Sequence, residues 1–390
     1  MIILDKPYVS ALLSSTLQRL DVPVLKLGDV KVPEEEKLTL LDGDLFFEQL
    51  ENLSAPLLFN SENGLTMLTK YLPESKFAEW TSLFKNKAEF RRRMTKIYPS
   101  FYFREVSIRD LYELSLDSIP FPIIIKPIIG YSSVGVYRID CIGDWYSTVE
   151  KLIADINHSA SAYPSDVIDS QTVIIEELIQ GEEYAIDAYF TKEGKPVILN
   201  LFQRMFANDR DMSDRIYYTS KQVLKETLIP ITNFLEKLRN IDSLASFPLH
   251  FEVRITKDGK VVPIEVNPFR FAGIGTTELG VHAYGVNVYD YYFNQLEPNW
   301  EEKIEAMDDG IYSFLCAEFD PSISLESIQA VDHERFQQQF EEILEYRHMD
   351  YKEYPIFSVV FFKQYTWDEN KRLLALDLSN FISHLEPQLI

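Results

Sequence analysis

The sequence predicts an α/β fold with some α+β elements, because helical and strand patterns alternate along nearly all of its 390 residues. Two observations carry this prediction most directly. The chain starts with an apolar run at 2–4, a helical pattern and a second apolar run at 22–27, which is the order of a βαβ unit. Near residue 250, two alternating apolar runs flank Asp258-Gly259, which is typical of a β-hairpin.

Residues 1–84 are expected to form a small open α/β domain. Further strand candidates lie at 38–41 and 56–60, with a helical pattern at 44–53 between them. No glycine-rich fingerprint follows the first strand, so this region is a poor candidate for a dinucleotide site.

One basic helix is predicted over 80–96, where Phe84, Arg91 and Met94 recur at helical spacing. Taken by itself, this segment is explained most simply as a helix with a solvated basic face. A shorter helix is expected near 108–115, after an extended segment.

The stretch 121–140 reads as a buried strand, a glycine-containing loop and a second strand. Lys126 ends the first strand, and it needs an anionic partner because burying an unpaired ammonium group is costly. The backbone N–H groups between Gly130 and Gly135 could converge on phosphate oxygens. A plain hairpin loop is the alternative, and the lysine and the loop together favour a phosphate site.

An apolar strand, an acidic pair and a second strand follow at 172–190. Glu176 and Glu177 point to opposite faces of an extended chain, which excludes a glycosidase-like pair of carboxylates here. The charged segment 207–218 has no period and is expected to be a mobile loop near the site, and 225–240 is expected to be a helix.

The hairpin that follows places two carboxylates opposite each other. If Asp258 and Gly259 form a two-residue turn, Lys257 pairs with Lys260, and counting outward puts Glu252 opposite Glu265. Opposed side chains have Cβ atoms roughly 4.5–5.5 Å apart, and like charges at that distance are destabilising. Something must therefore offset the repulsion between the two carboxylates.

A divalent cation or a counter-ion could offset it. A hard cation such as Mg²⁺ binds carboxylate and amide oxygens, and Asn267 adds a third oxygen one pleat along the same face. The alternative is a solvated face on which Arg254 is the counter-ion. The opposite face is expected to be apolar and buried, with residues Phe251, Val253, Ile255, Val262, Ile264 and Val266.

Residues 301–390 are expected to form a small α/β appendage, after a charged break at 299–309. The predicted order is a strand, a helix at 334–345, a strand at 358–364 and a helix at 367–383. No site signature lies in this region.

Composition excludes several classes of protein. The formal net charge is -23, and no basic run is longer than Arg91-Arg92-Arg93, which argues against a non-specific nucleic-acid or anionic-membrane binder. No run of about 18 apolar residues occurs, so we expect neither secretion nor membrane insertion. The two cysteines form no disulfide framework or metal-ligand cluster, so a reducing, cytoplasmic setting is expected.

Taken in order, the basic helix, the strand lysine with its glycine loop, the run EELIQGEEY and the acidic hairpin ending in EVNP resemble the ATP-grasp superfamily. The resemblance spans roughly 85–295 and is to carboxylate-amine or thiol ligases and to carbamoyl-phosphate-synthase-like ATP-grasp domains. It implies an ATP-grasp fold in three parts. These would be a pre-ATP-grasp domain at 1–84, the nucleotide-binding and catalytic region at 85–300, and the C-terminal appendage at 301–390.

The resemblance also implies roles for nucleotide-binding residues. The lysines that hold the α- and β-phosphates match Lys87 and Lys126, and Lys85 lies close enough to compete with Lys87. The flexible loop over the phosphates matches Ser132, Ser133 and Val134. The adenine contacts match the carboxylate of Glu176 and the backbone of Glu177 and Ile179. The acid that binds the ribose hydroxyls matches Glu183.

Metal and catalytic roles follow in the same way. The resemblance makes Glu252, Glu265 and Asn267 the Mg²⁺ ligands, with Mn²⁺ as an alternative ion. Arg270 resembles the arginine that stabilises the transferring phosphoryl group, with Lys126 assisting. The run Asn267-Pro268-Phe269-Arg270 has one residue more between Asn and Arg than the common form, which leaves the role of Arg270 open.

These features predict an ATP- and Mg²⁺-dependent ligase that joins a carboxylate to an amine, with amino acids or small peptides as substrates and ADP and phosphate as products. A non-catalytic ATP-binding interaction protein and a kinase-like ATP-grasp enzyme are the alternatives. No nucleic-acid or membrane partner is expected, and a homo-oligomer is possible. Candidate substrate-binding residues are Arg204, Arg215, Arg254 and His282.

Overall fold

The computed structural model describes residues 1–53, 55–130, 135–160, 171–208, 211, 213–320 and 322–384. Its largest element is an antiparallel eight-stranded sheet in the order β12-β11-β8-β9-β10-β13-β16-β15. The strands, in chain order, are β8 Glu182–Phe190, β9 Pro196–Met205, β10 Ile216–Thr219, β11 Phe247–Ile255, β12 Val261–Pro268, β13 Ile311–Glu318, β15 Glu342–His348 and β16 Ile356–Gln364.

The N-terminal region forms a separate, parallel sheet in the order β2-β1-β3. Its strands and the intervening helices are β1 Ile2–Leu4, α1 Ala11–Arg19, β2 Val24–Lys26, α2 Gly43–Leu53 and β3 Leu58–Phe59. The predicted βαβ order is therefore present. The strand candidate at 38–41 makes only a single bridge, between Val24 and Leu40.

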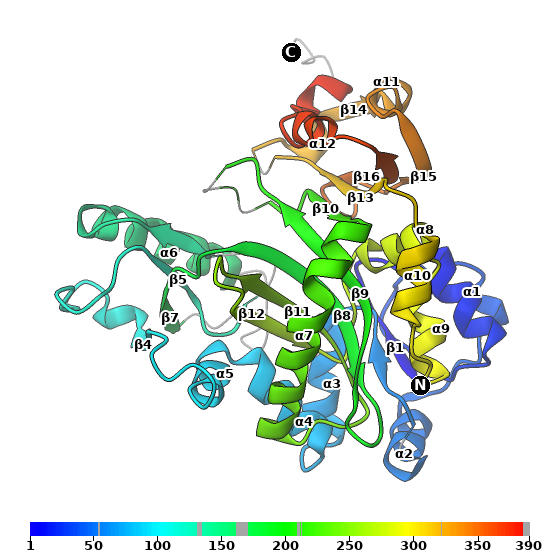
Figure 1. Cartoon of the computed structure of the whole chain (residues 1–390), viewed down its shortest axis with the longest axis horizontal. Helices are drawn as coiled ribbons and strands as arrows, with labels where there is room; N and C mark the ends of the chain where they lie inside the picture. Colours follow the sequence, from blue (N-terminus) through cyan, green and yellow to red (C-terminus); the bar gives the residue numbers. More distant parts are fainter. Residues whose placement is uncertain are drawn as a thin grey trace, which may run out of the picture.

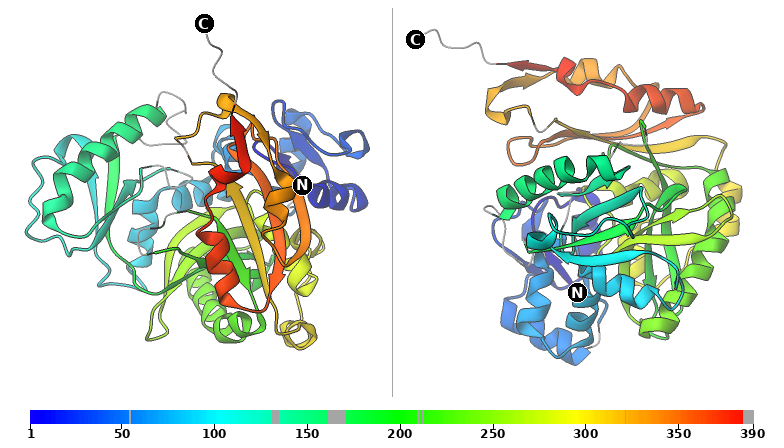
Figure 2. Two further views of the ribbon diagram at one scale, coloured as in Figure 1. Left: turned by 90° about the horizontal axis from the view of Figure 1, so that it is seen from above. Right: turned by 90° about the vertical axis from the view of Figure 1, so that its left-hand side faces the viewer.

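A third, four-stranded antiparallel sheet has the order β4-β7-β5-β6. It consists of β4 Phe103–Ser107, β5 Ile123–Pro127, β6 Tyr137–Ile139 and β7 Thr172–Glu177, with helix α6 Trp145–Ala160 packed on it. Figures 1 and 2 show this sheet and α6 on one side of the eight-stranded sheet and the N-terminal region on the other.

The predicted basic helix at 80–96 is two helices, α4 Lys76–Lys85 and α5 Lys87–Met94. Asn86 separates them, because its extended ψ of 102° ends α4 while its side chain accepts a hydrogen bond from the backbone N–H of Glu89 and so begins α5. The break lets Lys87 start a new helix that faces the four-stranded sheet.

The eight-stranded sheet continues across the predicted boundary near residue 300, since β13, β16 and β15 extend it. The helix predicted at 334–345 is wrong: α11 covers only His333–Gln337, and β15 follows. Edge pairing of β15 with β16 decides the conformation there, overriding local helical propensity. The helix predicted at 367–383 ends early, as α12 Trp367–Leu374, because 382–384 pair with β14 Ile328–Val331 as β17.

Two other predicted segments differ in part. The helix expected near 108–115 is a single short turn, Ile108–Asp110. The segment expected as a loop at 207–218 ends in strand β10, which pairs with both β9 and β13. Helix α7 is present and longer than predicted, at Lys221–Asp242.

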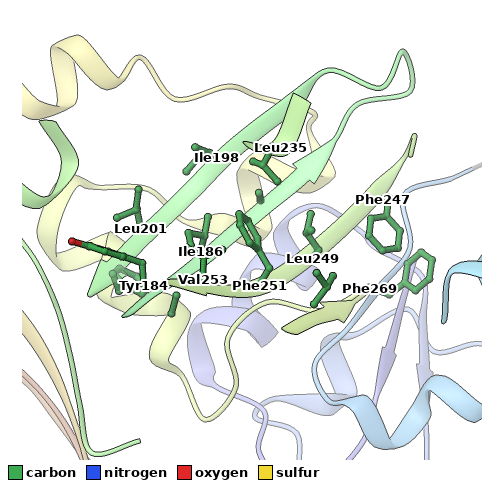
Figure 3. Close-up of a cluster of buried hydrophobic side chains, with 14 of the residues drawn as sticks. Tyr184, Ile186, Ile198, Leu201, Leu235, Phe247, Leu249, Phe251, Val253 and Phe269 are labelled. Carbon is green, nitrogen blue, oxygen red and sulfur yellow. The ribbon is translucent and has the colours of Figure 1, made fainter. Parts of the chain in front are cut away.

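Helix α7 covers one face of the sheet and buries its apolar side chains (Figures 1 and 3). Phe251 and Val253 are fully buried there, and the rings of Phe251 and Phe234 are 6.0 Å apart. The alternate residues of β8, β11 and β12 point to the other face of the sheet. This arrangement fixes where the polar residues of the hairpin must lie. In the described part of the chain, no helix is long and apolar enough to span a bilayer.

Candidate active site

The hairpin turn differs from the prediction by one residue. Thr256, rather than Lys257, pairs with Lys260: its backbone N–H donates to the Lys260 carbonyl at 3.0 Å. The turn therefore has three residues, and Gly259 adopts a left-handed φ of 79°, which a glycine reaches without strain. By itself, this shift would place Glu252 opposite residue 264.

A β-bulge restores the predicted pairing. Val253 pairs with Pro263, but the next pair is Glu252 with Glu265, so Ile264 is the extra residue on β12. The two one-residue shifts cancel, and the predicted opposition of Glu252 and Glu265 is confirmed. The face predicted for Val262 and Ile264 is wrong, because Val262 pairs with Arg254 and Ile264 lies in the bulge.

Three rows of side chains cross the polar face of strands β8, β11 and β12. The first row pairs Glu183 with Arg254, the second runs through Ala185, Glu252 and Glu265, and the third through Asp187, His250 and Asn267. The sheet thus brings acidic residues from two distant segments, 182–190 and 247–268, onto one surface.

The two opposed carboxylates have different electrostatic surroundings. Burial by itself would raise the pKa of Glu265, but the ammonium groups of Lys87 and Lys126 lower it to about 2. Burial raises the pKa of Glu252, and the negative charge of Glu265 raises it further. Glu265 is therefore the more firmly ionised member of the pair.

Lys87 lies at the site, as predicted. Its Nζ donates to the Gly130 carbonyl at 3.2 Å and lies 3.9 Å from Glu265 Oε2. Burial lowers the pKa of Lys87, and Glu265 opposes that effect. The competing Lys85 is instead paired with Glu62, with Nζ and Oε2 2.7 Å apart. Of the two lysines, Lys87 is therefore the one that lies beside Glu265.

Lys126 is also buried at the site, and its ion pair is with Glu176 at 2.8 Å. Arg91 binds the other carboxylate oxygen of Glu176. These two cations lower the pKa of Glu176 to about 2 against the opposing effect of burial. Both Glu176 oxygens are thus bound by cations, and the adenine contact that the resemblance implies for Glu176 stays a prediction.

Glu183 is held by two arginines. Arg204 Nη1 donates to one of its oxygens at 2.8 Å and Arg254 Nε to the other at 3.0 Å. Arg254 also donates to the Ile179 carbonyl at 2.7 Å, while the Glu177 backbone N–H donates to Tyr102 at 3.1 Å. Of the residues predicted to contact ribose and adenine, Arg254 thus links Glu183 to the backbone of Ile179, and Glu176 contacts Lys126.

The extra residue before Arg270 is accommodated locally. Phe269 adopts a left-handed φ of 58°, its N–H donates to the Pro248 carbonyl at 2.8 Å, and its carbonyl accepts from Phe59 at 2.7 Å. Arg270 consequently lies close enough to lower the pKa values of Glu62 and Glu265 through its charge. Its Nε is buried and has no hydrogen-bond partner in the described structure, which leaves a donor for an anionic ligand.

The donor set fits a magnesium ion that is shared with a nucleotide. Among the described residues, no group of three or more His, Cys, Asp or Glu side chains is arranged to hold a metal ion. Glu252, Glu265 and Asn267 supply two carboxylates and one amide. Mg²⁺ keeps several waters and takes phosphate oxygens in addition to one or two carboxylates, so an incomplete protein set is what it requires.

The predicted phosphate-loop residues Ser132, Ser133 and Val134 lie outside the described residues. The ends of their loop are described: Gly130 accepts from Lys87, and Gly135 has a left-handed φ of 68°. The loop therefore starts beside the lysine that lies nearest Glu265.

The structure adds a residue that the sequence analysis did not single out as functional. Asp187 is fully engaged: it accepts from His250 and from the Ala272 backbone N–H at 2.8 Å, from Asn200 at 2.9 Å and from Thr277 at 2.6 Å. Its alternation with Glu183 placed it on the polar face, but the partners that surround it come from three separate segments: β9, β11 and 272–277.

A second, partly buried network joins the three parts of the chain. Arg347 donates to Glu278 at 2.6 Å and to Glu345 at 2.5 Å, and Glu278 also accepts from Ser10. His282 lies 3.0 Å from Glu345. The predicted candidate His282 is thus in this network, and no sequence pattern connects its members.

Comparison with known proteins agrees with this geometry. Residues 119–278 match the family model described as ATP-grasp domain. A search of curated proteins found no sequence match. At the sequence identities of the solved structures below, similarity establishes the fold alone.

Three solved structures illustrate the similarity. The L-amino acid ligase from Bacillus licheniformis is 16% identical with a TM-score of 0.71, and 98% of each chain is covered. N5-carboxyaminoimidazole ribonucleotide synthetase from Thermotoga maritima is 12% identical with a TM-score of 0.61, again with 98% of each chain covered. Biotin carboxylase from Campylobacter jejuni is 10% identical with a TM-score of 0.59, covering 93% of this chain and 87% of that one. The predicted family resemblance and fold are confirmed.

Proposed function

We propose that this chain, whose residues 119–278 form an ATP-grasp domain, is an ATP- and Mg²⁺-dependent ligase that joins a carboxylate to an amine and releases ADP and phosphate. The observation that carries the proposal is the cluster of cationic groups from Lys87, Lys126 and Arg270 around Glu265. Three cationic groups gathered around a metal-binding pair form a site for a polyphosphate with its ion.

The residues of the chain have separable tasks in this proposal. ATP and Mg²⁺, when bound, would supply the phosphoryl group and part of its charge neutralisation. Lys87 and Lys126 would hold phosphate oxygens, and Glu252, Glu265 and Asn267 would hold the ion. The unpartnered Nε of Arg270 donates to the charge that develops as the phosphoryl group reaches the substrate carboxylate. The protein needs no nucleophile, because positioning and charge neutralisation dominate phosphoryl transfer.

Activation of the carboxylate explains why such a site serves ligation. A carboxylate is a poor acyl donor, whereas an acyl phosphate is readily attacked by an amine. Water would destroy the acyl phosphate, so the site must exclude it. The buried surroundings of Lys126 and Glu176 meet that requirement on the phosphate side.

We infer that the substrates are amino acids or small peptides. The support is the structural similarity, over 98% of both chains, to the L-amino acid ligase from Bacillus licheniformis. Of the four candidate substrate residues, Arg204 and Arg254 are occupied by Glu183, and Arg215 donates to the Leu374 and Leu376 carbonyls at 3.0 and 2.9 Å. His282 lies 3.0 Å from Glu345, in the network that links all three regions.

The test is phosphate release from ATP with pooled carboxylates and pooled amines, in the presence of Mg²⁺ and then of Mn²⁺. We expect release that requires one member of each pool, with ADP as the nucleotide product. Formation of AMP and pyrophosphate would contradict the mechanism. Nucleotide binding without turnover would favour a non-catalytic ATP-binding protein, and a stable phosphorylated product would favour a kinase-like enzyme.

The organisation and setting of the enzyme are proposed with its function. We propose the division into 1–84, 85–300 and 301–390, although the eight-stranded sheet joins the second and third parts. We also propose a cytoplasmic enzyme, because the substrate ATP and free cysteines suit a reducing compartment.

A further inference from the structure

The guanidinium group of Arg91 connects the four-stranded sheet to the metal-binding hairpin. Arg91 lies on α5 and is 2% exposed. Its Nε donates to Glu176 on β7, while its Nη1 and Nη2 donate to the carbonyls of Pro263 and Ile264 on β12 at 2.6 and 3.2 Å. A single planar group therefore contacts two sheets that share no strand.

The two carbonyls are accessible to one side chain because of the bulge. Strand β12 is the edge of the eight-stranded sheet, so its outer carbonyls have no neighbouring strand. In a regular strand, successive carbonyls point in opposite directions, and one fork could not reach both. The extra residue Ile264 interrupts this alternation, and the fork of Arg91 matches the result.

Each end of this contact leads directly to a proposed ligand-binding group. On one side, Glu176 holds Lys126 at 2.8 Å. On the other side, the bulge at Ile264 is followed at once by Glu265 and sets its position opposite Glu252. Lys126 is thus connected to the Arg91 guanidinium through Glu176, and Glu265 directly follows a residue whose carbonyl the same guanidinium binds.

We propose that Arg91 is a positioning residue that fixes Lys126 and Glu265 relative to each other, so that a nucleotide phosphate and its metal ion meet both at once. This inference rests on the proposed function. The ring of Phe101 lies against the guanidinium, 4.6 Å from its Cζ, and restricts its rotation. Arg91 touches neither proposed ligand, so its effect passes through Glu176 and the bulge.

The substitution Arg91→Lys tests this role, because lysine keeps the charge but lacks the planar fork. The matched control is Arg93→Lys on the same helix, where the arginine pairs with Asp242 at 2.8 Å and contacts neither sheet site. Binding of the non-hydrolysable β,γ-imido analogue of ATP is measured by titration at several Mg²⁺ concentrations. The Mg²⁺ concentration for half-maximal effect is then measured at saturating analogue.

We expect Arg91→Lys to weaken analogue binding and to raise the half-maximal Mg²⁺ concentration, each by about 10–100-fold, as is typical when a residue that orients a ligand group is lost. Arg93→Lys should change both by less than about twofold. A third variant, Glu176→Gln, removes the carboxylate through which Arg91 reaches Lys126 but leaves the two hydrogen bonds from Arg91 to the β12 carbonyls. It should weaken analogue binding while leaving the half-maximal Mg²⁺ concentration near the wild-type value.

The outcomes separate the two proposals. Equal behaviour of Arg91→Lys and Arg93→Lys, or a Mg²⁺ shift in Glu176→Gln as large as in Arg91→Lys, would overturn the role of Arg91 and leave the ligase proposal standing. Failure of the wild-type protein to bind the analogue with Mg²⁺ would overturn both. If Arg91→Lys does not fold, a Mg²⁺ shift in Glu176→Gln still decides against the role.

Discussion

Two acidic groups, Asp187 and Glu265, lie on the same face of the eight-stranded sheet, and their surroundings differ. Asp187 accepts four hydrogen bonds between 2.6 and 2.9 Å. Glu265 has only an amide donor, Asn267, at 3.3 Å and an ammonium group, Lys87, at 3.9 Å. The two clusters meet where His250 Nε2 lies 3.7 Å from Glu252 Oε1.

The difference distinguishes a structural cluster from a ligand site. A buried carboxylate with all its acceptor positions filled is satisfied by the protein itself and stabilises the fold. A carboxylate whose charge is stabilised by cations at a distance, beside an unpartnered arginine donor, is arranged for groups that the protein does not supply. Asp187 and Glu265 thus differ in their surroundings although they pair with His250 and Glu252, which are only two positions apart on β11.

The largest effect is expected from Glu265→Gln, which removes one metal-binding charge. Turnover should fall by about 10²–10³-fold, the loss typical of removing one charge-stabilising group from an active site. Circular dichroism should show an intact fold, because the amide keeps the shape of the side chain. Wild-type activity in this variant would remove the metal site from the proposal.

Glu252→Gln is the matched control for the electrostatics. The pKa of Glu265 is lowered, so its charge stabilises the fold, whereas the pKa of Glu252 is raised, so its charge is unfavourable. At neutral pH, Glu265→Gln should therefore unfold at a lower temperature than Glu252→Gln. The reverse order in a thermal melt would contradict the assigned charges.

Asp187→Asn should have its main effect on stability. Replacing an acceptor oxygen with a donor breaks part of a buried network, which typically costs about 3–5 kcal/mol of unfolding free energy. Urea denaturation measures this, and Asp308→Asn is the surface control, since Asp308 is half exposed and its ion pair with Lys363 contributes less than about 1 kcal/mol. Lost nucleotide binding with unchanged stability would show that the Asp187 cluster is a ligand site.

The smallest effect expected is that of Lys87→Met compared with Lys85→Met. A hydrogen bond to a charged group contributes about 1.5–3 kcal/mol, so Lys87→Met should raise the KM for ATP by about 10–100-fold. Lys85→Met leaves Lys87 in place and should change that KM much less, because Lys85 is paired with Glu62. Steady-state kinetics at saturating co-substrates measure both, and equal shifts would mean that Lys85 also binds the nucleotide.

Periodicity and turn chemistry predicted the elements that form the site. The hairpin, the strand that ends at Lys126 and the alternation of Glu183 with Asp187 are local patterns. The local patterns failed where pairing between strands decided the conformation. At 334–345, a helical pattern gave way to the edge strand β15, because pairing with β16 overrides propensity.

The opposition of Glu252 and Glu265 shows how a correct prediction can rest on an incomplete reason. The turn has one residue more than expected, and the bulge at Ile264 compensates for it. A local turn motif does not report a bulge farther along the strand, because that bulge is bound by a side chain from a distant helix. In this chain Arg91 holds the bulge, and the sequence alone had indicated only a solvated basic face around it.

The sequence by itself determined the chemical groups of this protein and their order: two lysines, a glycine-containing stretch, an acidic strand and a hairpin with opposed carboxylates. These follow from local periodicity and residue type, which a chain carries without its neighbours. Only the tertiary structure decided their partners. It placed Glu176 against Lys126 and Arg91, gave Asp187 four hydrogen-bond donors and left Arg270 Nε without a hydrogen-bond partner among the described residues. The reason is that buried charges are satisfied by groups from distant segments, which only the fold brings together.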